Sequence, residues 1–132
     1  MPVIVVWDDE EQTIQRYSFV APWTWDEYRA AVEQAWTDAR TRPYVVNVII
    51  DFTHMGALPQ GYLTHFSRTA MTRISPNLGI VVLVGMKGFM HTVNQLMMQL
   101  FPRLAERINH ANSLEEARAI IARHVDERKL KP

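Results

Sequence analysis

Residues 44–62, YVVNVIIDFTHMGALPQGY, contain the stretch that decides the predicted fold. They open with apolar, mostly β-branched residues, which predict a strand over residues 45–51, and after Asp51 a glycine-containing loop leads to Pro59. A short apolar run between breaker residues is typical of a strand buried on both faces of a parallel sheet. Because open α/β sheets bind ligands and partners outside the carboxyl ends of such strands, residues 51–62 form the candidate functional segment.

Four further strands are predicted around this central one. Residues 78–84, LGIVVLV, are equally apolar and are expected beside it, parallel and almost fully buried. Residues 3–7 and 13–21 are joined by a short acidic connection, which predicts an antiparallel hairpin, and the alternation along 13–21 gives that strand one wet face. Residues 107–111 predict a weak, polar strand, which fits an edge of the sheet.

Four helices complete the expected fold. Thr24 and Glu27 form a capping box at the start of the first helix, and Ser113 with Glu116 forms a second one at the start of the last helix. Two further helices are expected at 59–74 and at 89–101. The element order is therefore β-β-α-β-α-β-α-β-α. This alternation predicts an α/β fold with a mixed, mostly parallel five-stranded sheet and right-handed crossovers.

Composition excludes several classes of protein. The 132 residues suffice for one domain with its own core, and 48% hydrophobic with 21% charged residues is typical of a globular chain. Because there is no cysteine, disulfides, thiolate metal sites and cysteine nucleophiles are excluded. The amino-terminal residues lack the features of a secretory signal, and no apolar run approaches the ~20 residues of a membrane helix. We therefore expect a soluble cytoplasmic protein without membrane insertion, with residues 1–132 in a single domain.

Charge is balanced overall but divided along the chain. Residues 1–60 carry nine acidic and four basic side chains, whereas residues 61–132 carry five acidic and ten basic ones. This asymmetry could orient a partner or attract two copies head to tail. Charges scattered over solvated helix faces explain it equally simply, and we favour that explanation. The basic residues are not interleaved with aromatic ones, so no nucleic-acid partner is expected.

No catalytic constellation is visible, so we predict a protein that is not an enzyme and needs no cofactor. The five histidines lack the spacing of dedicated metal ligands, and although His54 and His65 could approach each other, a pair without metal is the simpler expectation. Gly85 and Gly88 precede a predicted helix start, where free amides and Lys87 would favour an anion. A plain tight turn explains the same residues and is the interpretation we favour.

Two groups of large apolar residues allow either a core or a contact surface. Trp23, Trp25 and Trp36 suggest an aromatic ligand cage, but aromatic residues at helical spacing more often fill a core. Met90 and Met98 lie off the apolar stripe of the helix expected at 89–101. Core filling is again the first expectation, yet this helix is the best candidate for a protein interface and for a homodimer.

Three segments together resemble a known family. They are VIIDFT at 48–53, LGIVVLVG at 78–85 and SLEEARAII at 113–121. With the element order, they resemble a STAS domain, the sulfate-transporter and anti-sigma-factor-antagonist family, in its stand-alone bacterial form. Members whose names link them to CRAL-TRIO lipid-binding proteins are the most similar. The resemblance implies a non-enzymatic regulatory module that binds partner proteins.

The resemblance also implies a phosphorylation switch that this chain departs from. In partner-switching members, a serine or threonine near the start of the helix after the central strand is phosphorylated by the partner kinase. Residues 51–53, Asp-Phe-Thr, match the first part of the usual pattern. Placing Gly61 on the family glycine, however, puts Pro59 and Gln60 where the serines stand. Neither accepts a phosphate, so we predict regulation without this switch.

Two hypotheses of function follow. The first is a protein-interaction module of the anti-sigma-antagonist kind, which binds through the loop at 52–62 and the neighbouring helices. The second is a binder of a small apolar or anionic ligand, similar to CRAL-TRIO lipid binders, with the ligand between the methionine-rich helix and the sheet. The residues predicted to contact the partner or ligand are Asp51, Thr53, His54, Gln60, Gly61, Lys87 and Gly88.

Overall fold

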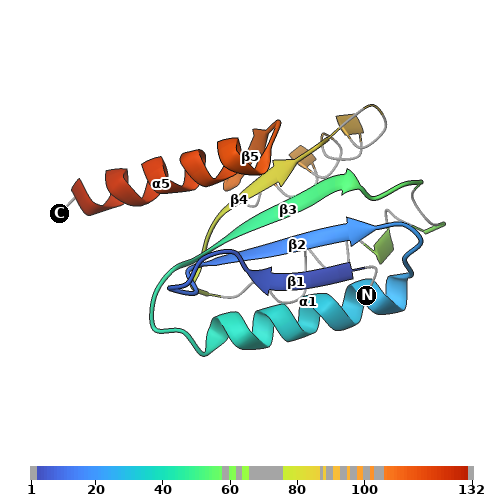
Figure 1. The fold of residues 1–132 in the computed structure, drawn as a ribbon, viewed down its shortest axis with the longest axis horizontal. Coiled ribbons are helices and arrows are strands. Elements are labelled where there is room, and N and C mark those ends of the chain that lie inside the picture. The colour runs from blue at the N-terminus through green and yellow to red at the C-terminus, as the bar shows by residue number, and fades with distance from the viewer. Residues whose placement is uncertain are drawn as a thin grey trace.

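The computed structural model describes residues 3–57, 60–61, 64–65, 76–86, 88, 91–92, 95, 98–99, 102 and 106–130. Five strands in this part form one sheet: β1 (Val3–Trp7), β2 (Ile14–Val20), β3 (Val46–His54), β4 (Leu78–Val84) and β5 (Ile108–Ala111). Their spatial order follows the sequence, β1-β2-β3-β4-β5 (Figure 1). β1 and β2 are antiparallel and all other neighbours are parallel, which confirms the predicted α/β class and the mixed, mostly parallel sheet.

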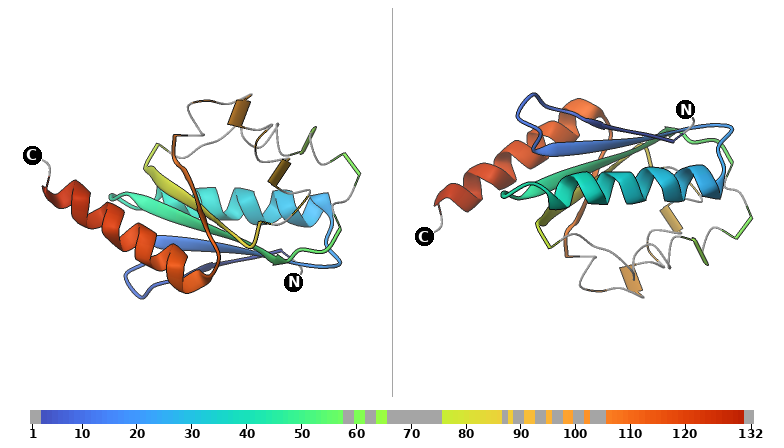
Figure 2. Two further views of the ribbon diagram at one scale, coloured as in Figure 1. Left: turned by 90° about the horizontal axis from the view of Figure 1, so that it is seen from above. Right: turned by 90° about the horizontal axis from the view of Figure 1, so that it is seen from below.

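Two helices cover opposite faces of the sheet, α1 (Trp25–Arg40) and α5 (Leu114–Leu130), as the two views of Figure 2 show. One core cluster lies between α1 and strands β1 to β4, and a second lies between α5 and strands β3 to β5. Of the four predicted helices, these two are observed. The helices expected at 59–74 and 89–101 fall largely on residues outside the described part.

The predicted pairing of the two most apolar strands is confirmed. β3 and β4 are adjacent and parallel, and the centre of each is inaccessible, with Ile49 and Val82 both 0% exposed. The predicted end of the central strand was wrong, because β3 continues beyond Asp51 to His54. The extension is held by β2, where Val20 pairs with His54 and the amide of Ala21 donates to the His54 carbonyl. An apolar run in the sequence cannot reveal this polar continuation, since it depends on the neighbouring strand.

The alternation predicted for the second strand is confirmed. Gln15, Tyr17 and Phe19 are buried on the face covered by α1, and the residues between them are half-buried or exposed. The buried Gln15 amide donates from Nε2 to the carbonyl oxygen of Ala35 in α1 at 2.7 Å. A polar side chain is tolerated here because its donor is paired with a helix carbonyl.

The two predicted capping boxes differ in outcome. At α1, the Glu27 amide donates to the Thr24 hydroxyl oxygen and the Thr24 amide donates to the Glu27 carboxylate, so the box is complete. At α5, the Glu116 amide donates to Ser113 Oγ, but the Glu116 carboxylate accepts from the amide of Asn112. In the second cap, the glutamate therefore bonds the amide of the residue before the capping serine instead of the amide of the serine itself.

In the part of the chain that the structure describes, no helix is long and apolar enough to span a membrane.

A buried asparagine bridges β3 and β4 at an irregularity in their register. Asn47 is 2% exposed, and its Oδ1 accepts the backbone amide of Ile80 at 2.9 Å, between the paired positions Val46 and Val48. The bond requires a glycine next to it, since a Cβ on Gly79 would lie 2.0 Å from that oxygen. This contact fixes the register of the two central strands.

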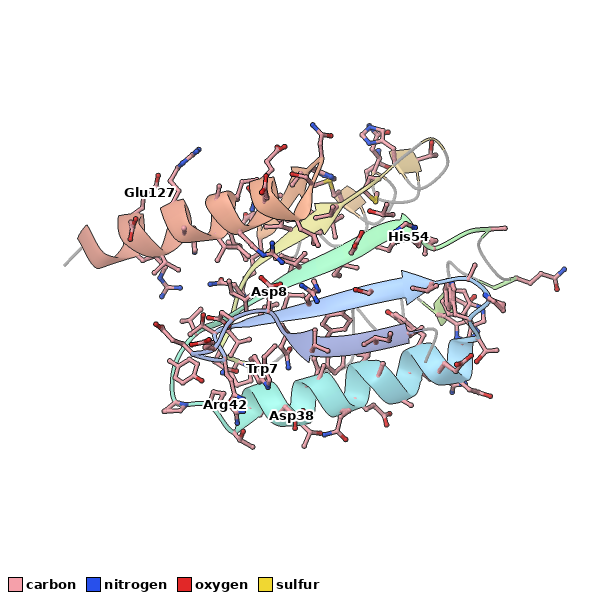
Figure 3. All side chains as sticks on the ribbon, in the orientation of Figure 1. Trp7, Asp8, Asp38, Arg42, His54 and Glu127 are labelled. Atoms are coloured by element: carbon pink, nitrogen blue, oxygen red, sulfur yellow. The ribbon has the colours of Figure 1, made fainter. Side chains whose placement is uncertain are left out.

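A buried carboxylate connects the amino-terminal hairpin to the last helix. The side chain of Asp8, labelled in Figure 3, is 2% exposed and accepts from Arg16 on β2 at 2.5 Å and from Arg118 on α5 at 2.8 and 2.9 Å. The hydrogen bond from Arg118, together with the charges of both arginines, lowers the pKa of Asp8 against the opposing effect of burial. Asp8 thus holds α5 to a part of the sheet that the helix does not cover.

Candidate functional site

The candidate site begins where β3 passes Asp51. This residue is half-buried and is paired in register with Ser18 of β2 and Val84 of β4. Its Oδ1 accepts both the backbone amide of Thr53 at 2.9 Å and the Thr53 hydroxyl at 2.5 Å. A carboxylate that accepts a backbone amide two residues later forms a local turn, so Asp51 shapes the end of the strand and orients the Thr53 side chain.

The end of the neighbouring strand packs directly against Thr53. Gly85, the residue after β4, has φ +77°, and a Cβ there would lie 2.8 Å from Thr53 Oγ1 and 3.0 Å from the Thr53 amide nitrogen. Glycine meets both the conformational and the steric requirement. From the sequence, Gly85 was assigned to a tight turn, with an anion site as the alternative. Its contact with Thr53 was not predicted, because the parallel pairing of β3 and β4 brings the two residues together.

The segment after β3 is fastened to the beginning of α1 by two tryptophans. Trp23 donates from Nε1 to the carbonyl oxygen of the buried Met55 at 2.9 Å, and Trp25 donates from Nε1 to that of Gln60 at 2.6 Å. The ring of His65 stacks on Trp25 with centroids 4.5 Å apart and planes 13° apart. The backbone carbonyls of Met55 and Gln60 are therefore anchored to residues at and just before the start of α1.

These two tryptophans belong to a cluster of aromatic side chains that pack against one another beside the site. Phe19 stacks on Phe52 with ring centroids 5.5 Å apart and meets the edge of Trp23 at 5.0 Å, and Trp25 meets Trp23 at 4.9 Å. Such pairs contribute about 0.5–1.5 kcal/mol each beyond the area they bury. The rings contact one another, so the favoured interpretation of the tryptophans as core residues agrees with the packing of Trp23 and Trp25.

The predicted contact residues form three groups rather than one. Asp51 and Thr53 lie together with Gly85, whereas Gln60 and Gly61 lie beside Trp25 and His65. Gly88 belongs to a third group, because its carbonyl accepts the amide of His91 at 3.1 Å. The exposed members of the predicted set are Thr53, His54, Gln60, Gly61 and Gly88. Lys87 lies outside the described residues.

One histidine near the site, His65, packs against an aromatic ring. His65 is stacked on Trp25, and among the described residues no group of three or more histidine or acidic side chains is arranged to hold an ion. A separate pair, His91 and His110, has ring centroids 6.4 Å apart. Burial, and secondarily the charge of His91, lowers the pKa of His110.

Fold and site define the class of this protein. It is an α/β protein with a mixed five-stranded sheet, and the exposed residues Thr53 and His54 lie at the carboxyl end of β3. Comparison with known proteins finds no family model, no curated protein and no solved structure that matches the chain. A function therefore has to be inferred from the geometry of the predicted contact residues.

Proposed function

We propose that this protein is a non-enzymatic regulatory module that binds a partner protein through the rim. The rim is the set of described contact residues named above: Asp51, Thr53, His54, Gln60, Gly61 and Gly88. The observation that carries the proposal is the Asp51–Thr53 turn packed against Gly85, which holds polar groups in a fixed arrangement beside exposed side chains. The resemblance to stand-alone STAS domains supports the same function, because in partner-switching members the partner kinase acts on a residue near the start of the helix after the central strand.

A rigid rim is suited to binding because little conformational entropy remains to be lost. The aromatic cluster and the bonds from Trp23 and Trp25 restrain the backbone before a partner arrives. Asp51 uses Oδ1 for both bonds from Thr53, and no hydrogen bond to its Oδ2 is found among the described residues. A donor from a partner, such as an arginine or a backbone amide, fits this oxygen.

The contact between the Thr53 hydroxyl and the Asp51 carboxylate also has the form of a nucleophile and a base. We propose a structural role for it, because the carboxylate oxygen that accepts the hydroxyl also accepts the Thr53 amide within one turn. Nucleophilic catalysis requires a third group that orients the base. Among the hydrogen bonds of the described residues, none joins a histidine to this pair.

The proposal is tested by capture of a partner in the native host, followed by affinity measurements with purified proteins. His54→Glu and Gln60→Lys each change the charge of an exposed rim side chain and are expected to weaken binding at least tenfold. Glu127→Ala, at the far end of α5 in Figure 3, is the matched surface control and is expected to change affinity less than twofold. Equal affinities for all three variants would contradict a binding role for the rim.

We further predict that the rim is not phosphorylated. Pro59 and Gln60 carry no hydroxyl, and the nearest described hydroxyls belong to Thr53 and Thr64. A phosphate on Thr53 would bring almost two negative charges to the oxygen that now donates to Asp51. Mass spectrometry of protein purified from its host, with and without stress, is expected to find both threonines unmodified. Stoichiometric phosphate on either residue would refute the prediction.

The remaining predictions concern residues that the structure describes only in part. A small apolar or anionic ligand was expected between the sheet and the helix at 89–101, and most of that helix lies outside the described residues. The proposed interface through the same helix rests on Met90, which also lies outside them, and on Met98, which is half-buried. The ligand site and the helix interface both stay predictions. Binding of a partner protein through the rim is the function that the described geometry favours.

A further inference from the structure

One edge of the sheet is formed by β1, and its hydrogen-bonding pattern can be assigned. The amide of Asp8 donates to the carbonyl of Ile14, directly after the register that pairs Val6 with Arg16 and Ile4 with Ser18. In an antiparallel pair of strands, the backbone N–H and C=O groups of alternate residues bond to the neighbouring strand, and those of the residues between them point away from it. The even positions of β1 therefore bond to β2. The backbone groups of the odd positions, Val3, Val5 and Trp7, point to the open edge of the sheet.

This edge lacks the features by which proteins usually protect edge strands. β1 reads VIVVW, without charge or proline, and its five residues pair with β2 in a continuous register without a bulge. Lysines, prolines and bulges are the common means of preventing a new strand from joining. The opposite edge, β5, is shorter and contains Asn109 and His110. β1 is therefore the edge that is suited to further pairing.

The side chains of β1 differ between its two faces. Val3 is 4% exposed and belongs to the core cluster under α1, and Val5 packs against the same cluster. Ile4 and Val6, each 39% exposed, lie on the other face, where α5 packs on β3, β4 and β5. The side chains of Ile4 and Val6 thus remain partly exposed at the β1 edge of the sheet, outside the strands on which α5 packs.

We propose that β1 pairs with β1 of a second copy of this chain, antiparallel about a twofold axis at Val5, so that the two sheets join into one. In this register Val5 faces the partner's Val5, and Val3 faces the partner's Trp7, each pair exchanging backbone hydrogen bonds through the groups that point outward. Ile4 then lies directly opposite the partner's Val6 in the closer, non-hydrogen-bonded type of pair. The strand is its own complement, because it carries no charge and each apolar residue meets another.

The pairing is expected to be weak and reversible. Five residues per copy bury far less than the ~800 Å² per partner of a standard stable interface. The dimer should therefore form with rising concentration. It goes beyond the proposed partner binding, since β1 is separate from the rim residues and leaves them accessible.

Charge complementation tests the register. In a dimer of the double variant I4K/V6K, each lysine lies opposite a lysine of the partner, and in a dimer of I4E/V6E each glutamate lies opposite a glutamate. Like charges repel, so each variant alone should raise the dissociation constant of the dimer at least tenfold. A mixture of the two opposes lysine to glutamate in both pairs and should recover dimers. Val20→Lys, at a 42% exposed position on β2, is the matched control and should leave the constant within twofold. Sedimentation velocity over a wide concentration range measures all four samples.

Amide hydrogen exchange gives a second readout that does not depend on the variants. In the wild-type protein, the amides of Val3, Val5 and Trp7 should exchange freely when dilute and become protected at high concentration. The amides of Ile4 and Val6 should be protected throughout, because they bond to β2. A protein that stays monomeric at every concentration would overturn the proposal. Failure of the mixture to dimerise, or free exchange at the odd positions within a dimer formed elsewhere, would also overturn it.

Discussion

Gly79→Ala is expected to lower the free energy of unfolding by about 3 kcal/mol, the largest effect of any substitution considered for this protein. The added Cβ would lie 2.0 Å from Oδ1 of Asn47 and 2.8 Å from Cγ1 of Val45. Asn47 has to move, which separates its oxygen from the buried amide of Ile80. Overpacking and an unpaired donor thus add at one position between the central strands.

Thermal and denaturant unfolding measure this loss. The melting temperature should fall by about 10 °C, with an unchanged denaturant slope. Gly88→Ala is the matched control, because Gly88 has φ +50° but no heavy atom within 4 Å of an added Cβ. Its cost should be limited to backbone strain of about 1 kcal/mol. A loss below that value for Gly79→Ala would contradict the close contact between Gly79 and Asn47.

Asp8→Asn is expected to lower the free energy of unfolding by about 2 kcal/mol at neutral pH. The substitution removes the charge that accepts from Arg16 and Arg118, but both arginines remain partly exposed, at 28% and 44%, and can be hydrated instead. The loss should therefore be smaller than for an arginine left fully buried. Asp26→Asn is the control, because Asp26 is 90% exposed and pairs only at the surface with Arg29. It should cost at most about 0.5 kcal/mol.

The effect of Asp8 should depend on pH in a defined direction. Its pKa is lowered in the folded protein, and an unfolded aspartate has a pKa of about 3.9. A carboxylate whose pKa is lower in the folded than in the unfolded protein stabilises the fold. This stabilisation is complete when the pH is above the pKa of the unfolded state, and it is lost as the pH falls through the pKa of the folded state. Denaturant unfolding should therefore show the wild type and Asp8→Asn converging as the pH falls below about 4. A constant difference at every pH would show that the charge of Asp8 is not the source of the effect.

Local sequence patterns were sufficient to predict most of the elements. β-branched runs predicted β3 and β4, alternation predicted the buried face of β2, and Thr24 with Glu27 predicted the start of α1. Each of these signals comes from residues close together in the chain, where burial and capping leave a periodic trace. The end of β3 was placed too early because Asp51 reads as a breaker, whereas pairing with β2 carries the strand to His54.

The sequence predicted where three of the candidate residues lie, but not the contacts that they make. Asp51, Thr53 and His54 were identified from their position after an apolar strand, and all three lie at that end of the sheet. The contact of Thr53 with Gly85 and the bond from Trp25 to Gln60 were not predicted. Both join segments more than thirty residues apart, and a single sequence contains no signal for contacts of that kind.

The sequence by itself determined the class of this protein: apolar runs too short for a membrane helix, separated by amphipathic segments, lead to an α/β sheet. Only the tertiary structure decided which polar residues are buried and which segments supply their partners. Asp8 and Asn47 look like ordinary surface residues in the sequence, yet both are buried and bridge separate elements, Asp8 to Arg118 over 110 positions. The reason is physical, since hydrophobic burial is encoded locally, whereas the partner of a buried polar group is supplied by whichever segment the fold brings beside it.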